Sequence, residues 1–138
     1  MNWSPRYESV VLRARRYAPY LLGVEIFVTL VFALVPVDSV LLSVYIWDKA
    51  QHFSVFAVLT LTASFAYPNN RPVACVGLLA FGFLIEILQA SMTSSRSGEL
   101  LDVIADGIGI VIGGLLYALI QRVFLPAIPD TVLPPPKP

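Results

Sequence analysis

The chain has 138 residues, of which 57% are hydrophobic and 13% are charged, and its formal net charge is zero. Its mean hydropathy is +0.78. Soluble domains usually have roughly half apolar and about a quarter charged residues. The composition therefore excludes an ordinary soluble domain and favours a membrane protein that forms one compact bundle. The basic residues form no aromatic-interleaved patch, which excludes nucleic acid as a partner.

Four apolar segments predict membrane-spanning helices. In chain order they are Tyr17–Val37, Asp48–Tyr67, Pro72–Ala90 and Leu101–Leu125. Each has close to the ~20 residues that an α-helix needs to cross a hydrocarbon core. A helix also pairs its own backbone groups, as lipid requires. We therefore expect an all-α, polytopic membrane protein with a four-transmembrane-helix bundle.

The flanking segments and connections complete this organisation. Residues 1–16 form a basic N-terminal segment, residues 17–125 the membrane domain, and residues 126–138 a proline-rich tail. The turn residues YPNNRP, at 67–72, predict a tight hairpin between the second and third spans.

The basic residues are distributed unevenly about these spans. Only Lys49 and Arg96 lie on one side. Seven lie on the other side, namely Arg6, Arg13, Arg15, Arg16, Arg71, Arg122 and Lys137. The positive-inside rule then predicts an integral plasma (inner) membrane protein with cytoplasmic N- and C-termini. The side with Lys49 and Arg96 should face the outside or the periplasm.

The second span opens with the charged stretch WDKAQHF. Asp48 and His52 are four residues apart, and Lys49 and His52 are three apart. Residues at these spacings share one face of a helix. His52 is the only histidine of the chain, so this face carries the one side chain that ordinarily titrates near neutral pH.

The third and fourth spans place further polar residues at a similar depth. Glu86 and Gln89 are three residues apart near the outer end of the third span, and Asp102 and Asp106 are four apart near the start of the fourth. Ionisable residues inside a membrane usually face the bundle interior and mark a functional site. The predicted binding residues are Asp48, Lys49, His52, Glu86, Gln89, Arg96, Asp102 and Asp106. The alternative is that they are ordinary helix-end charges that reach out to water.

Two glycines continue the polar face of the fourth span. Asp102, Asp106, Gly109 and Gly113 recur at spacings of four, three and four, which keeps them on one face. Gly109 and Gly113 form a GxxxG pair, which allows a neighbouring helix to approach closely. We therefore expect this face, with both aspartates, to point into the bundle.

Together these motifs resemble the VanZ-like family, which is named for the teicoplanin-resistance protein. The matching elements are DKxxHF from Asp48 to Phe53, ExxQ from Glu86 to Gln89, and Arg96 followed by Asp102, Asp106 and Gly109. The resemblance extends over roughly Trp47 to Gly114. The family pattern more often has asparagine at the position of Asp106. The resemblance implies a membrane protein of the cell envelope with a glycopeptide-resistance-like accessory role, and it brings no settled chemistry.

The first hypothesis is a binding role. An outward-facing, acidic pocket would bind a lipid-linked cell-wall or polysaccharide precursor, or the head group of a membrane phospholipid, directly or through a divalent cation. Arg96 is the best partner for a phosphate because its guanidinium group is a bidentate donor. Candidate ligands for a cation are Glu86, Asp102 and Asp106, whose oxygens suit Mg²⁺, Ca²⁺ or Mn²⁺.

Two alternatives remain open. In a membrane-embedded enzyme acting on a lipid-linked phosphate, the candidate catalytic residues are His52 as general acid or base, and Asp48 or Glu86 as its orienting partner. The sequence reveals no evident nucleophile for such an enzyme, and it does not decide whether there is turnover. In the other alternative the cluster is a structural polar network or a proton-handling site. The oligomeric state and the role of Glu25 are also left open.

Overall fold

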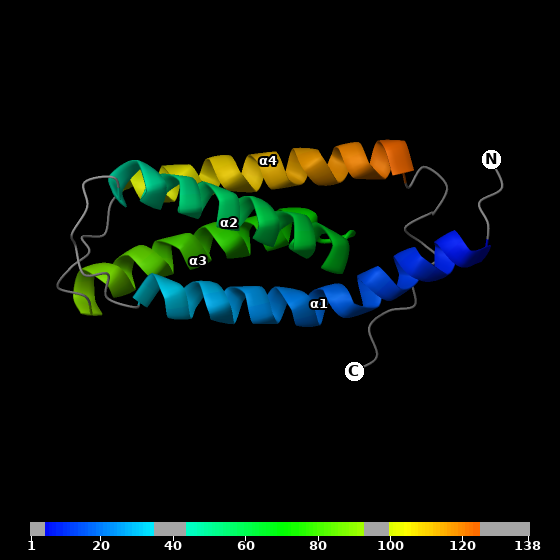
Figure 1. Ribbon diagram of the computed structural model, residues 1–138, viewed down its shortest axis with the longest axis horizontal. Coiled ribbons are helices and arrows are strands. Elements are labelled where there is room, and N and C mark those ends of the chain that lie inside the picture. The colour runs from blue at the N-terminus through cyan, green and yellow to red at the C-terminus, as the bar shows by residue number, and fades with distance from the viewer. Residues whose placement is uncertain (1–4, 35–43, 93–99, 125–138) are drawn as a thin grey trace.

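The described part of the chain is almost entirely helical. The computed structural model describes residues 5–34, 44–92 and 100–124. Four helices follow one another, and they are α1 (Pro5–Leu34), α2 (Val44–Ala66), α3 (Arg71–Met92) and α4 (Leu100–Phe124) (Figure 1). These ranges contain no strand. The predicted all-α fold class is confirmed, and the hydrophobic segments lie on the four helices.

Helix α1 begins well before the apolar segment that predicted it. It starts at Pro5, and the basic segment up to Arg16 continues without a break into the apolar part. Proline is well suited to the first turn of a helix, because the backbone N–H that it lacks would have no partner there. The basic arginines therefore extend the same helix beyond the apolar part.

The turn between α2 and α3 is the hairpin that YPNNRP predicts. Tyr67 donates its backbone N–H to the Ala63 carbonyl at 2.8 Å, and Asn70 donates to the Tyr67 carbonyl at 3.0 Å. Pro68 has no N–H to continue the helix. Ala74 then donates to the Asn70 carbonyl at 3.0 Å, which starts α3.

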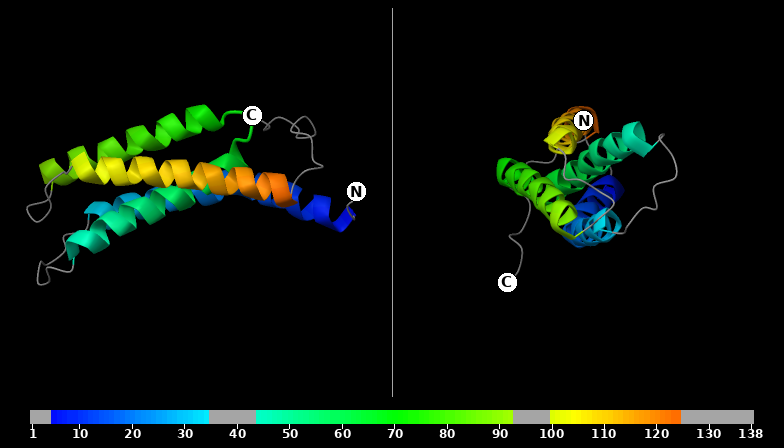
Figure 2. Two further views of the ribbon diagram at one scale, coloured as in Figure 1. Left: turned by 90° about the horizontal axis from the view of Figure 1, so that it is seen from above. Right: turned by 90° about the vertical axis from the view of Figure 1, so that its left-hand side faces the viewer.

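Helix α2 lies at the centre of the bundle. Its most extensive contacts are with α4, and it also packs against α1 and α3. Among the described helices, α1 contacts α2 and α3 but not α4. Helices α1 and α4 lie on opposite sides of the bundle (Figures 1 and 2). The buried apolar core draws on α1, α2 and α3 and consists of Leu22, Phe56, Leu59, Ala63, Leu78 and Ile85.

The contact between α2 and α4 is a close approach of two backbones. A Cβ atom at Gly109 would collide with the carbonyl oxygen of Phe53, and one at Gly113 would collide with that of Ala57. At Gly113 the same atom would also lie 2.8 Å from the Cβ of Thr60. The GxxxG pair of α4 therefore packs directly on α2, where any side chain would separate the helices.

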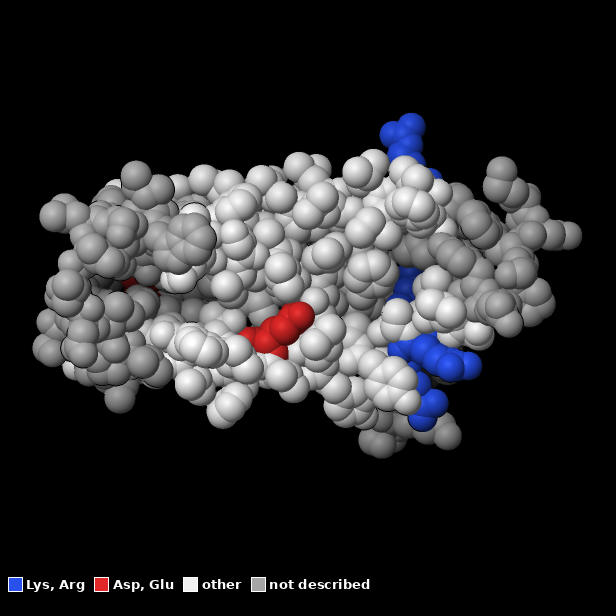
Figure 3. Space-filling model, in the orientation of Figure 1, with Lys and Arg blue, Asp and Glu red and all other residues white. Residues whose placement is uncertain are grey.

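The exterior of the bundle is apolar. Three stretches are long and apolar enough to cross a membrane, namely Ser9–Leu34, Arg71–Ser91 and Leu100–Phe124. Large hydrophobic side chains are exposed along them, and the described part of the face in Figure 3 is mostly uncharged, apart from an acidic patch near its middle and basic side chains towards one end. These features indicate a membrane protein. Helix α2 is not among the three, and its described start carries Lys49, Gln51 and His52.

Candidate functional site

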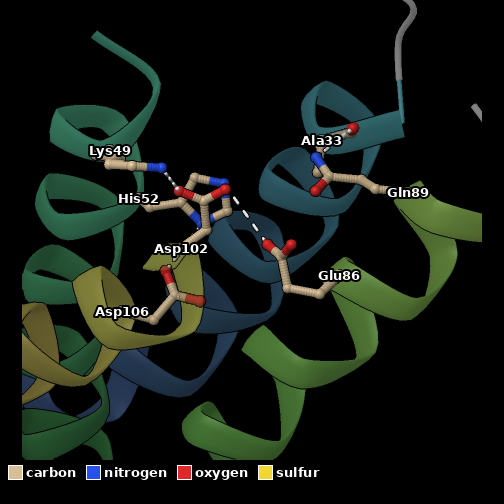
Figure 4. A network of polar contacts seen from close by, with 7 residues as sticks. All are labelled: Ala33, Lys49, His52, Glu86, Gln89, Asp102 and Asp106. Atoms are coloured by element: carbon tan, nitrogen blue, oxygen red, sulfur yellow. Dashed lines mark hydrogen bonds and ion pairs between the residues drawn. The ribbon is translucent and has the colours of Figure 1, made fainter. Parts of the chain in front are cut away.

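Six polar side chains meet at one end of the bundle, between the first turns of α2 and α4 and the last turns of α3. This polar cluster consists of Lys49, His52, Glu86, Gln89, Asp102 and Asp106 (Figure 4). All except Lys49 are buried. The sequence predicted that these residues share a site, and the structure places them together.

His52 lies at the centre of the polar cluster, between two carboxylates from different helices. Its Nδ1 is 2.9 Å from Oδ1 of Asp106 on α4, and its Nε2 is 4.0 Å from Oε1 of Glu86 on α3. Asp106 is fully buried, with a relative exposure of 0%. A buried carboxylate accepts a hydrogen bond, so the Asp106 contact places the proton of a neutral imidazole on Nδ1.

Lys49 and Asp102 form the outer part of the polar cluster. The Lys49 ammonium donates to Oδ1 of Asp102 at 3.0 Å. The side chain of Lys49 is 24% exposed, whereas that of Asp102 is 5% exposed. Lys49 therefore lies at the rim of the cluster, one helical turn before His52, and partly offsets the charge of a buried aspartate.

Gln89 connects the polar cluster to α1. Its Nε2 donates to the backbone carbonyl of Ala33 at 3.0 Å. Ala33 lies in the last turn of α1, where carbonyl groups have no partner within the helix. The sequence analysis gave α1 no part in the site. The group that α1 contributes is a backbone carbonyl, and the residue type at that position does not reveal it.

Replacing Gln89 with leucine should remove this link at little cost in packing volume. We expect a loss of about 1 kcal/mol in the free energy of unfolding, since the Ala33 carbonyl would lose its partner in a partly buried position. Unfolding by SDS in mixed micelles, followed by circular dichroism, measures this loss. Ser91→Ala is the matched control, because Ser91 is exposed and bonds only within its own helix; an equal loss in the control would contradict the prediction.

Gly82 is a site residue that the sequence analysis missed. A Cβ atom at this position would collide with Oδ2 of Asp106 and would lie 3.3 Å from the ring of Phe56. The missing side chain makes room for the Asp106 carboxylate against α3. Gly82 precedes Glu86 by four residues and so lies on the same face, a spacing that could have revealed it.

The polar cluster carries a surplus of negative charge. Its described residues include three carboxylates and one ammonium, which leaves two negative charges when His52 is neutral. Buried charges without partners are costly. The arrangement suits a positively charged ligand, or a polar ligand that brings its own cation.

Three members of the polar cluster could hold a metal ion. His52, Glu86 and Asp102 each offer one donor atom, and these three atoms all lie within 4.8 Å of one another. The sequence analysis instead named Glu86, Asp102 and Asp106. The structure groups His52 with the first two, and it directs Asp106 Oδ1 to the far nitrogen of the imidazole ring.

Some residues named in the sequence analysis cannot be placed. The side chain of Asp48, together with Arg96 and residues 126–138, lies outside the described residues. Glu25 does have a place, away from the polar cluster. Its Oε1 accepts a hydrogen bond from the Thr62 hydroxyl at 3.1 Å, which links α1 to α2.

Comparison with known proteins adds no relative from which a function could be taken. No protein-family model, no curated protein and no solved structure matches this chain. The resemblance to the VanZ-like family stays a prediction from the motifs, and the site is interpreted from its geometry and charge.

Proposed function

We propose that this chain is a VanZ-like integral membrane protein of the cell envelope whose polar cluster binds the head group of a phospholipid or of a lipid-linked cell-wall or polysaccharide precursor. One observation carries the proposal. Five buried polar side chains from three helices, including one histidine and three carboxylates, meet at one end of a bundle that is otherwise apolar outside. Polar groups at membrane depth are costly and usually serve a function.

The proposed topology has four spans and cytoplasmic termini. Helix α2 has 23 residues, which is enough to cross a hydrocarbon core, and it packs against each of the other three helices. The basic side chains in Figure 3 gather near the end of the bundle where α1 begins and α4 ends. The positive-inside rule places that end in the cytoplasm, so the polar cluster would face the outer leaflet of the inner membrane.

The carboxylates of the polar cluster decide which ligand it would accept. Glu86, Asp102 and Asp106 lie beside one ammonium and one histidine, and buried carboxylates repel a second anion. A phosphate head group could therefore approach only together with a cation or beside a basic residue.

A ligand that binds here should stabilise the protein against heat. Polyprenyl phosphate, added with Mn²⁺ at about 100 times its dissociation constant, is expected to contribute about 2.7 kcal/mol. This corresponds to a rise of roughly 5 °C or more in the unfolding midpoint. Circular dichroism of the purified chain in detergent measures the rise. His52→Gln should abolish it.

Glu25→Gln is the matched control, because it also removes a polar function from a helix but lies away from the polar cluster. It should retain the full rise in midpoint. A wild type that shows no rise with polyprenyl phosphate or phospholipid, together with a His52→Gln variant that is much less stable, would overturn the proposal in favour of a structural network.

The contact between His52 and Asp106 favours a second candidate function, an acid–base enzyme acting on a lipid-linked phosphate. A histidine held by a buried carboxylate is a common arrangement for proton transfer. Such an enzyme would release phosphate from polyprenyl pyrophosphate, and His52→Gln would stop the release while ligand binding persisted. No phosphate release by the wild type would exclude this candidate.

A further inference from the structure

Three donor atoms from three separate helices converge in the polar cluster. They come from His52 on α2, Glu86 on α3 and Asp102 on α4, and each of these residues is at least nine-tenths buried. We propose that these three side chains bind one divalent transition-metal cation, with Asp106 as the positioning residue that orients His52. The inference deepens the proposed function, because it rests on the same site and names the cation that a head group would meet.

The distances suit a shared ion after a small adjustment. The three donor atoms lie within 4.8 Å of one another, and His52 Nε2 is 4.0 Å from Glu86 Oε1. Bonds to an ion are roughly 2.0–2.2 Å long for nitrogen and carboxylate ligands, so three ligand atoms spaced evenly around one ion lie at most ~3.8 Å apart. Closing around an ion needs each donor atom to shift by less than ~1 Å, which side-chain rotations provide.

The hydrogen bond to Asp106 prepares His52 as a ligand. A metal-binding histidine donates its second ring N–H to a carboxylate or carbonyl, which fixes the tautomer and makes the other nitrogen a better ligand. Asp106 Oδ1 is 2.9 Å from Nδ1, so the lone pair of Nε2 faces Glu86.

The carboxylates of the polar cluster favour a cation as its ligand. Glu86 and Asp102 contribute one carboxylate each, and Asp106 lies on the other side of His52. Within the part of the chain that the structure describes, Oδ2 of the fully buried Asp106 has no hydrogen-bond partner. Among the described residues Asp106 is hydrogen-bonded to His52 alone, so a cation bound to the opposite ring nitrogen would stabilise Asp106 as a carboxylate.

The donor set indicates which ions would bind. One imidazole nitrogen and two carboxylate oxygens form a mixed set, and imidazole suits transition metals while Mg²⁺ and Ca²⁺ prefer oxygen alone. Mn²⁺ accepts both kinds of donor, and Zn²⁺ also binds histidine and carboxylate. We therefore expect Mn²⁺ and Zn²⁺ to bind at least about tenfold more tightly than Mg²⁺ and Ca²⁺.

A bound cation would convert a site that repels phosphate into one that attracts it. Three protein ligands leave coordination positions for further oxygen atoms. A phosphate oxygen of a lipid head group could occupy one of them and be held between the ion and the rim residue Lys49, whose ammonium lies 3.0 Å from Asp102. The cation thus identifies phosphate as the chemical class of the head group.

The test is titration of the full chain in detergent with Mn²⁺ alone, followed by electron paramagnetic resonance of the free ion. One Mn²⁺ should bind per chain, and Zn²⁺ should displace it. Glu86→Gln and Asp102→Asn should each weaken binding by more than about tenfold, and Asp106→Asn by about 10–100-fold through its effect on His52. Glu25→Gln, which removes a carboxylate outside the polar cluster, should bind as the wild type does.

Lys49→Met keeps the test decisive if a ligand variant fails to fold. It removes a positive charge beside Asp102, so binding should become tighter by several-fold, whereas a network without an ion predicts only a less stable protein. Absence of Mn²⁺ and Zn²⁺ binding at millimolar concentration in the folded wild type overturns the proposal. An equal loss of binding in Glu25→Gln also overturns it.

The two proposals about this site can fail separately. If Mn²⁺ binds but polyprenyl phosphate and phospholipid do not raise the unfolding midpoint, the cation site stands and the head-group function is wrong. If the lipid stabilises the protein equally in the presence of EDTA and the titration shows no Mn²⁺ binding, the head-group function stands and the cation site is wrong.

Discussion

Replacing Gly113 with leucine is expected to separate α4 from α2 and to lower the free energy of unfolding by about 3 kcal/mol or more. The first atom of any side chain at Gly113 would meet the carbonyl oxygen of Ala57 and the Cβ of Thr60. Neither a backbone oxygen nor a Cβ can rotate away, so the helices themselves must move apart. The contact between α2 and α4 is the most extensive one in the bundle, so its loss should be strongly destabilising.

Gly114 provides a control with the same change at the next position. A Cβ atom there would have no other atom within 4 Å, so Gly114→Leu should change stability by no more than about 0.5 kcal/mol. SDS-induced unfolding in mixed micelles measures both variants. Equal losses for Gly113→Leu and Gly114→Leu would show that α4 does not pack on α2 through this face.

The sequence identified this face of α4 but not the helix that packs on it. The spacing of Asp102, Asp106, Gly109 and Gly113 follows from helix geometry alone, so it could be read without a structure. The choice of α2 as the neighbour depends on how four similar apolar helices pack side by side, and hydrophobic periodicity contains no such information. Helix α1 also begins before the predicted apolar span Tyr17–Val37, because hydropathy recognises only the apolar part of a helix and not the basic turns before it.

The members of the polar cluster could likewise be predicted, but their pairing could not. The positions of His52, Glu86 and Asp106 along their own spans predicted that all three lie at a similar depth in the membrane. Asp48 or Glu86 was the expected orienting partner of His52. Glu86 does lie 4.0 Å from His52, but the shortest contact, at 2.9 Å, is with Asp106 of α4, which was not expected in this role. Contacts between helices depend on rotation of each helix about its axis, which a sequence does not give.

The second large effect is expected from His52→Ala, with a loss of about 3–5 kcal/mol in the free energy of unfolding, measured in EDTA so that no bound ion contributes. Asp106 is fully buried, and Oδ1 meets His52. Removing the imidazole leaves this carboxylate without its hydrogen-bond partner in a site from which water is largely excluded. The cost is then mainly that of an uncompensated buried group, added to that of the cavity.

A double-mutant cycle separates the pair from the cavity. If His52 and Asp106 act together, His52→Ala combined with Asp106→Ala should be less destabilising than the two single losses added, by about 1–3 kcal/mol. The reference cycle pairs His52→Ala with Thr62→Ala. Thr62 is ten residues further along α2, about 15 Å by helix rise, and it bonds to Glu25 instead. That cycle should be additive. Additive losses in both cycles would mean that the contact between His52 and Asp106 contributes nothing to stability.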